Sequence, residues 1–484
     1  MRGIGRVLVL WAMLLGSLAA HAEVLQGGLE LRWGDPHSPA KGAALAPQFS
    51  AVLVLDGGQR VALDPEQARR AAGDLYALAN RRVAIEFSRG KSTRQRVIEA
   101  IVPADDLAGQ REHPIAGKAD TVPKAVLGAT RWITLACRFS NVETEQKTIE
   151  FFRGQYGDSV GQLGHYWREV SYNKINLAGS DARGWFALPQ PRSHYVTLDS
   201  ATGKDKANLN QLFDDCTAAA DAQVDFSQVI GINMMFNDNL DGYAWGGGRC
   251  ATLDGVNRCW STTWNPPWAF ENLAPLAHEM GHGYGLPHSD NSDGDDDPYD
   301  NPWDVMSDSW RNAVVDGTYG ARPKHVNTFQ RDRLGWVDAA RKRTIAAGSP
   351  LARVTLDYAS LATSANTQML VLQTPASPDP YRGTVYTLEA RRPTGDYEAM
   401  LAGDAVIIHS VGSEYRAEAK SQDTDRPPAT VSNNEGSMFK VGEGWVSPDE
   451  LFWVTVESKT ATGFVVVVTA RPQATGGNQY RRRR

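Results

Sequence analysis

The chain has 484 residues, of which 42% are hydrophobic and 22% are charged, and its formal net charge is -6 at pH 7. This length exceeds what one compact core usually holds, so two or three domains are expected. The composition is that of a soluble globular protein. The slightly acidic balance gives no reason to expect binding to nucleic acid or to an anionic membrane surface.

The first residues have the pattern of a secretory signal. Arg2 and Arg6 precede an apolar stretch, residues 7–20, that is too short to span a bilayer, and Ala20-His21-Ala22 has the small-x-small pattern of a cleavage site. We therefore expect residues 1–22 to be removed and the protein to be secreted or periplasmic, with an uncleaved membrane anchor as the alternative. No later segment is apolar enough to predict stable membrane insertion after signal removal.

The sequence contains four cysteines, and export would place them in an oxidising compartment. None is in CxxC spacing, which disfavours a thiolate metal site and favours two disulfides. Three pairings are open. A Cys250–Cys259 bond would close a short loop that suits a hairpin, and Cys137–Cys216 would then follow.

Residues 23–104 alternate short apolar runs with turn signals and predict a β-rich N-terminal domain. The runs are at 29–33, 51–55 and 83–87, with a helical insertion around 64–78. Residues 105–129 are polar and rich in Gly and Pro, which favours a linker. If the N-terminal domain is a propeptide, cleavage is expected in this linker, but the sequence does not decide whether it is one.

Residues 130–345 mix strand and helix patterns and predict the catalytic domain. Buried strands are expected at 132–136 and 229–236, and helices at 148–166 and 272–284, where apolar residues recur at helical spacing.

Residues 346–475 return to strand patterns and predict a C-terminal β-sandwich, followed by a basic disordered tail at 476–484. The expected strands include runs at 369–372, 385–388, 406–408 and 464–468. The fold class expected for the whole chain is α+β.

One segment of the helix predicted at 272–284 has the spacing of metal ligands. His278 and His282 are four residues apart, so their imidazoles project from one face and can share a metal ion. Gly285 can adopt positive φ and end the helix, which lets His288 return as a third ligand. Three imidazoles at about 2.0–2.1 Å leave one tetrahedral position open, the arrangement of a catalytic zinc site.

Glu279 lies about 100° round the helix from His278, within reach of a water on the metal. The pattern predicts a Zn²⁺-dependent endopeptidase in which Glu279 takes the proton of the water and later delivers it to the leaving amine. We expect a protein or glycoprotein substrate and a monomeric enzyme. The alternatives are an inactive zinc-binding adhesion or recognition protein and a zinc hydrolase with another substrate.

The HExxHxxGxxH pattern from His278 to His288 resembles the metzincin signature, which implies a methionine-containing turn beneath the zinc. Met306, in the segment Asp304-Val305-Met306-Ser307, is the candidate for this turn. Because no cysteine precedes the catalytic region, an N-terminal propeptide that caps the zinc with a cysteine is excluded. Metzincins of the astacin and serralysin type have Tyr two residues after the turn methionine, where this chain has Asp308, so a tyrosine from that position is not expected at the metal.

Flanking segments resemble the gametolysin and immune-inhibitor-A-like secreted metallopeptidases over roughly residues 130–470. These segments are 166–172, 184–189, 334–336 and 386–391. The histidine at position 288 favours the gametolysin side, since immune-inhibitor-A-like enzymes usually have Asp there. The resemblance implies a metzincin-like catalytic domain, with a mixed sheet and an active-site helix. It also implies a substrate cleft along an edge strand near 246–248, Trp260, Trp264 and Trp268.

An acidic run follows the histidine motif. Oxygen ligands on a glycine-containing loop are what Ca²⁺ prefers, although the spacing does not match an EF-hand. A calcium site and a solvated acidic loop therefore remain alternatives. The candidate ligands are Asp290, Asp293, Asp295, Asp297 and Asp300.

Overall fold

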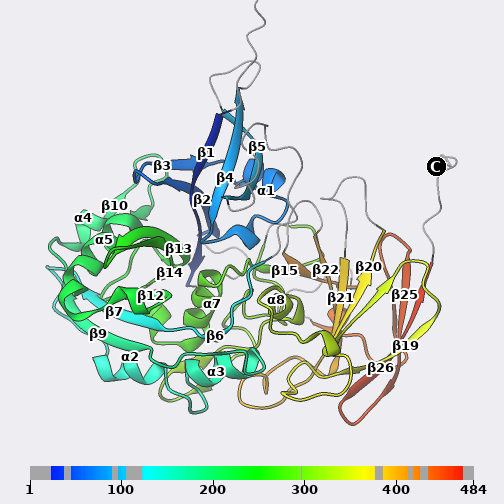
Figure 1. The fold of residues 1–484 in the computed structure, drawn as a ribbon. Helices are drawn as coiled ribbons and strands as arrows, with labels where there is room; N and C mark the ends of the chain where they lie inside the picture. Colours follow the sequence, from blue (N-terminus) through cyan, green and yellow to red (C-terminus); the bar gives the residue numbers. More distant parts are fainter. Residues whose placement is uncertain are drawn as a thin grey trace, which may run out of the picture.

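The computed structural model describes residues 23–37, 45–89, 96–104, 123–295, 297–375, 385–412, 418–425 and 434–471 (Figure 1). The predicted signal segment 1–22, the predicted tail 476–484 and most of the predicted linker lie outside the described residues. Within the described ranges, no helix has the length and apolar character needed to cross a membrane.

The N-terminal part is a sheet with one helix packed on it. Its elements are β1 (Glu23–Pro36), β2 (Gln48–Leu55), β3 (Arg60–Leu63), α1 (Pro65–Ala72), the 3₁₀ turn η1 (Tyr76–Leu78), β4 (Arg82–Arg89) and β5 (Arg96–Pro103). Helix α1 begins where Asp64 accepts a hydrogen bond from the Gln67 amide at 2.8 Å and Pro65 fills the first helical position. The predicted strand runs therefore lie in β1, β2 and β4, and the predicted helical insertion is α1 followed by η1.

The central part mixes strands and helices. Its elements are β6 (Gly128–Ala129), β7 (Trp132–Arg138), α2 (Ile149–Gln155), α3 (Leu163–Val170), β8 (Ile175–Asn176), β9 (Asp181–Ala187), α4 (Arg192–Tyr195), β10 (Val196–Leu198), β11 (Asp205–Ala207), α5 (Leu209–Ala220), η3 (Asp221–Gln223), η4 (Phe226–Gln228), β12 (Gly231–Phe236), β13 (Tyr243–Leu253), β14 (Val256–Asn265), α6 (Pro267–Phe270), α7 (Leu273–Gly283), β15 (Ser289–Asn291), β16 (Val314–Asp316), β17 (Gly320–Arg322) and α8 (Thr328–Arg333).

Two differences from the sequence expectation have local causes. The helix predicted at 148–166 is two helices, α2 and α3, because glycines weaken it and Gly161 has a φ of 82°, which a continuing helix does not allow. The described end of the predicted linker, 123–129, lies against the central part: the Val126 amide donates to Leu334 O at 3.0 Å, and β6 pairs with β8.

One sheet joins the N-terminal and central parts. Its order is β3-β2-β1-β13-β14-β12-β7-β9, with β4 and β5 branching from β1. Strands β14, β12, β7 and β9 are parallel, whereas β13 runs antiparallel to β14. Residues 32–36 of β1 pair antiparallel with residues 243–247 of β13, so the N-terminal strands extend the sheet at its β13 edge.

Two disulfides connect elements of the central part. Cys137–Cys216 links β7 to α5, and Cys250–Cys259 links the neighbouring strands β13 and β14. Of the three pairings open from the sequence, this is the one in which a hairpin is closed by its own disulfide.

The C-terminal part consists of two sheets over one hydrophobic cluster, the arrangement of a β-sandwich (Figure 1). One sheet has the order β15-β23-β22-β21-β20-β18 and the other β19-β26-β25-β24. Strand β15, directly after His288, therefore joins the histidine segment to this part. The remaining elements are η5 (Ala339–Arg341), β18 (Lys342–Ala346), β19 (Ala352–Asp357), β20 (Met369–Gln373), β21 (Val385–Arg391), β22 (Ala405–Val411), β23 (Ala419–Ser421), η7 (Glu435–Ser437), β24 (Gly444–Val446), β25 (Phe452–Lys459) and β26 (Gly463–Ala470).

Candidate metal centre

The three predicted histidines meet at one point beside α7. His278 and His282 lie one turn apart on this buried helix, and Gly285, with a φ of 89°, reverses the chain so that His288 faces them. The Nε2 atoms of His278 and His282 are 3.1 Å apart, and those of His282 and His288 are 3.2 Å apart. Helix α7 runs near the centre of the molecule, between the N-terminal strands and the C-terminal sheets (Figure 1).

Hydrogen bonds to backbone carbonyls orient the rings of His278 and His282, so that Nε2 of each ring faces the point where the histidines meet. The Nδ1 of His278 donates to Val305 O at 2.7 Å, and the Nδ1 of His282 donates to Leu286 O at 2.7 Å. Both Nε2 atoms therefore present lone pairs to the same point, as metal-binding imidazoles do.

The spacing of these nitrogens fits a tetrahedral metal ion. Two ligands that are each about 2.0–2.1 Å from a tetrahedral Zn²⁺ lie about 3.3–3.4 Å apart. The observed separations of 3.1 and 3.2 Å are close to this value. Lone pairs that converge so closely in a buried site repel one another, and a divalent cation between them removes that repulsion.

Met306 lies directly beneath the histidine helix. A Cβ added to Gly281, between the two helical histidines, would be 2.4 Å from the sulfur of Met306, so the helix and the turn are in close contact. Asp304 holds the turn in place, because its carboxylate accepts hydrogen bonds from the Met306 amide at 2.9 Å and from the Ser289 hydroxyl at 2.7 Å. The turn and the segment after His288 are thus fixed by one buried carboxylate.

Glu279 is buried beside the histidines, and its Oε2 has no hydrogen-bond partner among the described residues. Burial, and secondly the nearby charge of Asp35, raises the pKa of Glu279 well above its ordinary value. A Cβ on Gly246 of β13 would lie 2.7 Å from this oxygen, so a glycine is needed for the strand to approach the carboxylate. An unpartnered buried carboxylate is costly, which is typical of a functional group.

The structure adds a residue that the sequence did not predict. Asp35, near the end of β1, is buried against all three histidines. Its Oδ1 lies 2.7 Å from His288 Nε2, and its Oδ2 lies 3.5 Å from His278 Nε2 and 3.4 Å from His282 Nε2. The four side chains form one group that could hold a metal ion.

Asp35, His278 and His282 shift one another's pKa values. Burial opposes ionisation of Asp35, but the histidines outweigh it and hold its pKa well below the ordinary value. Burial lowers the pKa of His282 to about 3. Burial acts in the same direction on His278, but the Asp35 carboxylate outweighs it and raises the pKa of that ring. The ionised Asp35 and the neutral His282 are thus in forms that ligate metals, whereas the proton favoured on His278 would have to leave when a metal binds.

Tyr299 is a second residue that the sequence analysis missed. Its hydroxyl donates to Asp35 Oδ1 at 2.6 Å, and its ring centroid is 5.4 Å from that of His288. Burial, and then the charge of Asp35, raises the pKa of Tyr299 well above its ordinary value, so the hydroxyl keeps its proton. Asp308, by contrast, accepts from the Trp310 amide at 2.8 Å. The tyrosine beside the histidines thus comes from a position before Met306 rather than after it.

The predicted substrate cleft agrees only in part with the structure. Trp260 and Trp264 are fully buried in the core and line no surface, so this part of the prediction is wrong. Trp268 does lie at the centre: with Asp35, Glu279 and Trp310 it borders a cavity of ≈ 10 Å³, room for about one water molecule. The edge strand β13 is covered by β1.

The acidic loop brings three of its five candidate carboxylates together. Oxygens of Asp293, Asp295 and Asp300 lie within 4.8 Å of one another. Burial, and then the neighbouring carboxylates, beginning with Asp290, raise the pKa of Asp300 to about 9. Asp290 itself lies 3.4 Å from Lys420 Nζ, and Asp297 accepts from the Tyr299 amide at 3.1 Å.

A buried glutamate beside three converging histidines is the arrangement expected at the centre of a metallopeptidase. Comparison with protein families agrees: the family model described as gametolysin peptidase M11 matches residues 118–385, more than half of the chain. The chain therefore belongs to the gametolysin family of zinc metallopeptidases. A search of curated proteins found no match.

Proposed function

We propose that the chain is an exported zinc endopeptidase of the metzincin type. The observation that supports this most directly is the convergence of three imidazole Nε2 atoms above Met306, with the Glu279 carboxylate beside them. When bound here, Zn²⁺ polarises a peptide carbonyl and lowers the pKa of water. The two disulfides support export, since such bonds persist in oxidising compartments.

In this proposal Glu279 moves the proton. Its buried carboxylate has a raised pKa, so it accepts the proton of the attacking water readily and can pass it to the leaving amine nitrogen. Its unpartnered Oε2 leaves an acceptor free for that water. A site used only for adhesion would have no need of such a carboxylate, and this favours the enzyme over the inactive zinc-binding alternative.

Metal removal tests the proposed function. We expect 1,10-phenanthroline to abolish casein hydrolysis by the secreted protein, and about one equivalent of Zn²⁺ per chain to restore it after the chelator is dialysed away. The isomer 1,7-phenanthroline, which does not chelate, serves as the control and should have no effect. Hydrolysis that persists in protein shown by elemental analysis to be zinc-free would contradict the proposal.

The same preparation tests calcium at the acidic loop. We propose Asp293, Asp295 and Asp300 as ligands, because their carboxylate oxygens lie close together and a cation between them would offset the burial and the carboxylate repulsion that raise the pKa of Asp300. Millimolar Ca²⁺ should then raise the melting temperature, and EGTA should lower it, without change in zinc content. Equal melting temperatures in Ca²⁺ and EGTA would identify a solvated acidic loop instead.

We propose Tyr299 as the donor that stabilises the oxyanion. Its hydroxyl donates to Asp35 Oδ1 at 2.6 Å, next to the carboxylate oxygen that lies near His278 and His282. Tyr299→Phe should lower kcat by about 10²-fold with little change in KM, the effect of losing one such donor. Tyr195→Phe is the matched control, because this hydroxyl also donates to a carboxylate, that of Asp215, at 2.7 Å, whereas the Tyr195 ring packs in a hydrophobic cluster that contains none of the three histidines. Equal kcat values for the two variants would contradict the assignment.

A further inference from the structure

Strand β1 occupies the edge of the sheet that borders the metal centre. Residues 32–36 pair antiparallel with residues 243–247 of β13, and Gly246 within that stretch lies against Glu279. An extended peptide that adds to a sheet edge gains its affinity from the same backbone hydrogen bonds. A substrate aligned on β13 next to Glu279 would therefore need the position that β1 now fills.

Alternate residues of β1 face the centre, as the two-residue period of a strand requires. The indole of Trp33 stacks on the His282 ring with centroids 4.5 Å apart and planes 4° apart. Asp35 contacts the three histidines, and the ring of His37 lies 4.8 Å from that of Trp268 and 5.6 Å from that of Trp310. Trp33 and Asp35 of β1, and His37 just beyond its end, thus lie along the centre from one side to the other.

The Asp35 carboxylate completes the ligand geometry. Its Oδ2 is 3.5 Å from His278 Nε2 and 3.4 Å from His282 Nε2, beyond a good hydrogen bond. These separations match the roughly 3.3–3.4 Å expected between two ligands of one tetrahedral zinc ion. The carboxylate therefore lies where the fourth ligand belongs, which in a working zinc peptidase is water.

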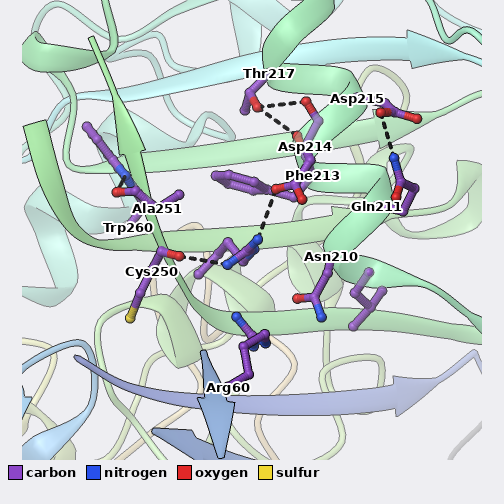
Figure 2. A network of polar contacts seen from close by, with 12 residues as sticks. Arg60, Asn210, Gln211, Phe213, Asp214, Asp215, Thr217, Cys250, Ala251 and Trp260 are labelled. Atoms are coloured by element: carbon purple, nitrogen blue, oxygen red, sulfur yellow. Dashed lines mark hydrogen bonds and ion pairs between the residues drawn. The ribbon is translucent and has the colours of Figure 1, made fainter. Parts of the chain in front are cut away.

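Contacts away from the metal hold β1 in this position. The buried carboxylate of Glu30 accepts from the Cys250 amide at 2.7 Å and pairs with arginines of both parts: Arg60 of β3 and Arg249 of β13. Figure 2 shows Arg60 on the N-terminal side of this interface, with Asn210 of α5 and Cys250 on the other. A second contact joins Asp74 to Arg333 of α8.

We infer that residues 23–104 form an inhibitory domain of the peptidase, in which Asp35 is the fourth metal ligand and residues 32–37 occupy the place of a substrate strand. This inference rests on the proposed function. Water and Asp35 exclude each other at a tetrahedral ion, so the full chain is latent until β1 leaves β13. The substrate class follows from the same contacts: an extended peptide with a flat or aromatic side chain between Trp268 and Trp310, where His37 lies.

The test uses the full chain loaded with Co²⁺, whose visible spectrum reports its ligands. Acetohydroxamate, a small ligand for the metal, is titrated into the wild type, Asp35→Ala and Asp56→Ala. Asp56 is a matched control, because it is an aspartate of the same domain in an exposed pair with Arg82. We expect Asp35→Ala to bind acetohydroxamate at least tenfold more tightly than the wild type, and Asp56→Ala to behave as the wild type.

Three further results decide the inference. Equal affinity of the wild type and Asp35→Ala for acetohydroxamate would overturn the inference. If the alanine variant does not fold, Asp35→Asn, which preserves the shape of the side chain, takes its place, and equal affinity in that variant would overturn the inference too. Tight binding of acetohydroxamate by Asp56→Ala would also overturn the inference, because a general loosening of the N-terminal domain would then explain the result without any role of Asp35 as a ligand. A different result bears on the proposed function. If Asp35→Ala binds acetohydroxamate tightly but neither this variant nor the secreted form hydrolyses casein, the proposed peptidase activity is refuted, whereas the assignment of Asp35 as a metal ligand is kept.

Discussion

Glu279→Gln is expected to reduce casein hydrolysis by about 10²- to 10⁴-fold while one zinc per chain remains bound. Glutamine has nearly the shape of glutamate but cannot take a proton from water at neutral pH. The metal should be retained because the proposed ligands are the imidazoles, and the Nδ1 contacts of His278 and His282 to Val305 O and Leu286 O do not involve position 279. Rates and zinc content would be measured on the same sample.

A control variant and a stability measurement complete the test of Glu279→Gln. Glu271→Gln makes the same change at a partly exposed site on the preceding turn, where the carboxylate lies 3.7 Å from Lys147, and should leave the rate within about twofold. The melting temperature of Glu279→Gln at pH 7 should not fall, because the substitution removes a buried carboxylate without a partner. Activity within tenfold of the wild type would refute Glu279 as the base.

The convergence of the three histidines could be predicted because its signal is local. His278, Glu279 and His282 lie on one helix, and one glycine-dependent turn returns His288, so residue spacing alone determines their geometry. Met306 required the family resemblance, since a methionine in a loop has no spacing signal of its own. The strands with continuous apolar runs, such as β12 and β26, were predictable for the same local reason.

Asp35 and Tyr299 could not be predicted, because strand pairing and loop packing bring them to the metal from distant or irregular segments. In the sequence, Asp35 stands between a glycine and a proline, which indicates only the end of a strand. The cysteine count bears only on a thiolate ligand and carries no information about a carboxylate at position 35. The partner of β1 could not be predicted either, because its apolar pattern indicates a strand but not the strand with which it pairs.

Arg391→Leu is expected to destabilise the folded protein by about 3–5 kcal/mol, because it removes one partner of a buried ion network. The guanidinium is fully buried. It donates to Glu389 Oε1 at 2.9 Å and to Trp303 O at 2.8 Å, and it also pairs with Glu398. The C-terminal sheet thereby holds the segment just before the Met306 turn, so zinc affinity should fall together with stability.

The pH dependence of this loss follows from Glu398. Burial opposes its charge, but Arg391 first and then His325 hold its pKa below the ordinary value. A carboxyl with a lowered pKa contributes stability that is present above its unfolded pKa of about 4.3 and is lost as the pH falls through its folded pKa. The difference between wild type and Arg391→Leu should therefore be largest near pH 7 and shrink as the pH falls below about 4.3.

Urea unfolding at pH 7 and pH 4, followed by tryptophan fluorescence, would measure both effects. Arg353→Leu is the matched control, since this arginine pairs with Glu457 while its side chain is 67% exposed, and exposed pairs contribute about 0–1 kcal/mol. Equal unfolding midpoints for the two variants at pH 7 would mean that the network does not hold the C-terminal sheet to the metal centre. A large loss confined to Arg391→Leu would identify this sheet as part of the support for the Met306 turn.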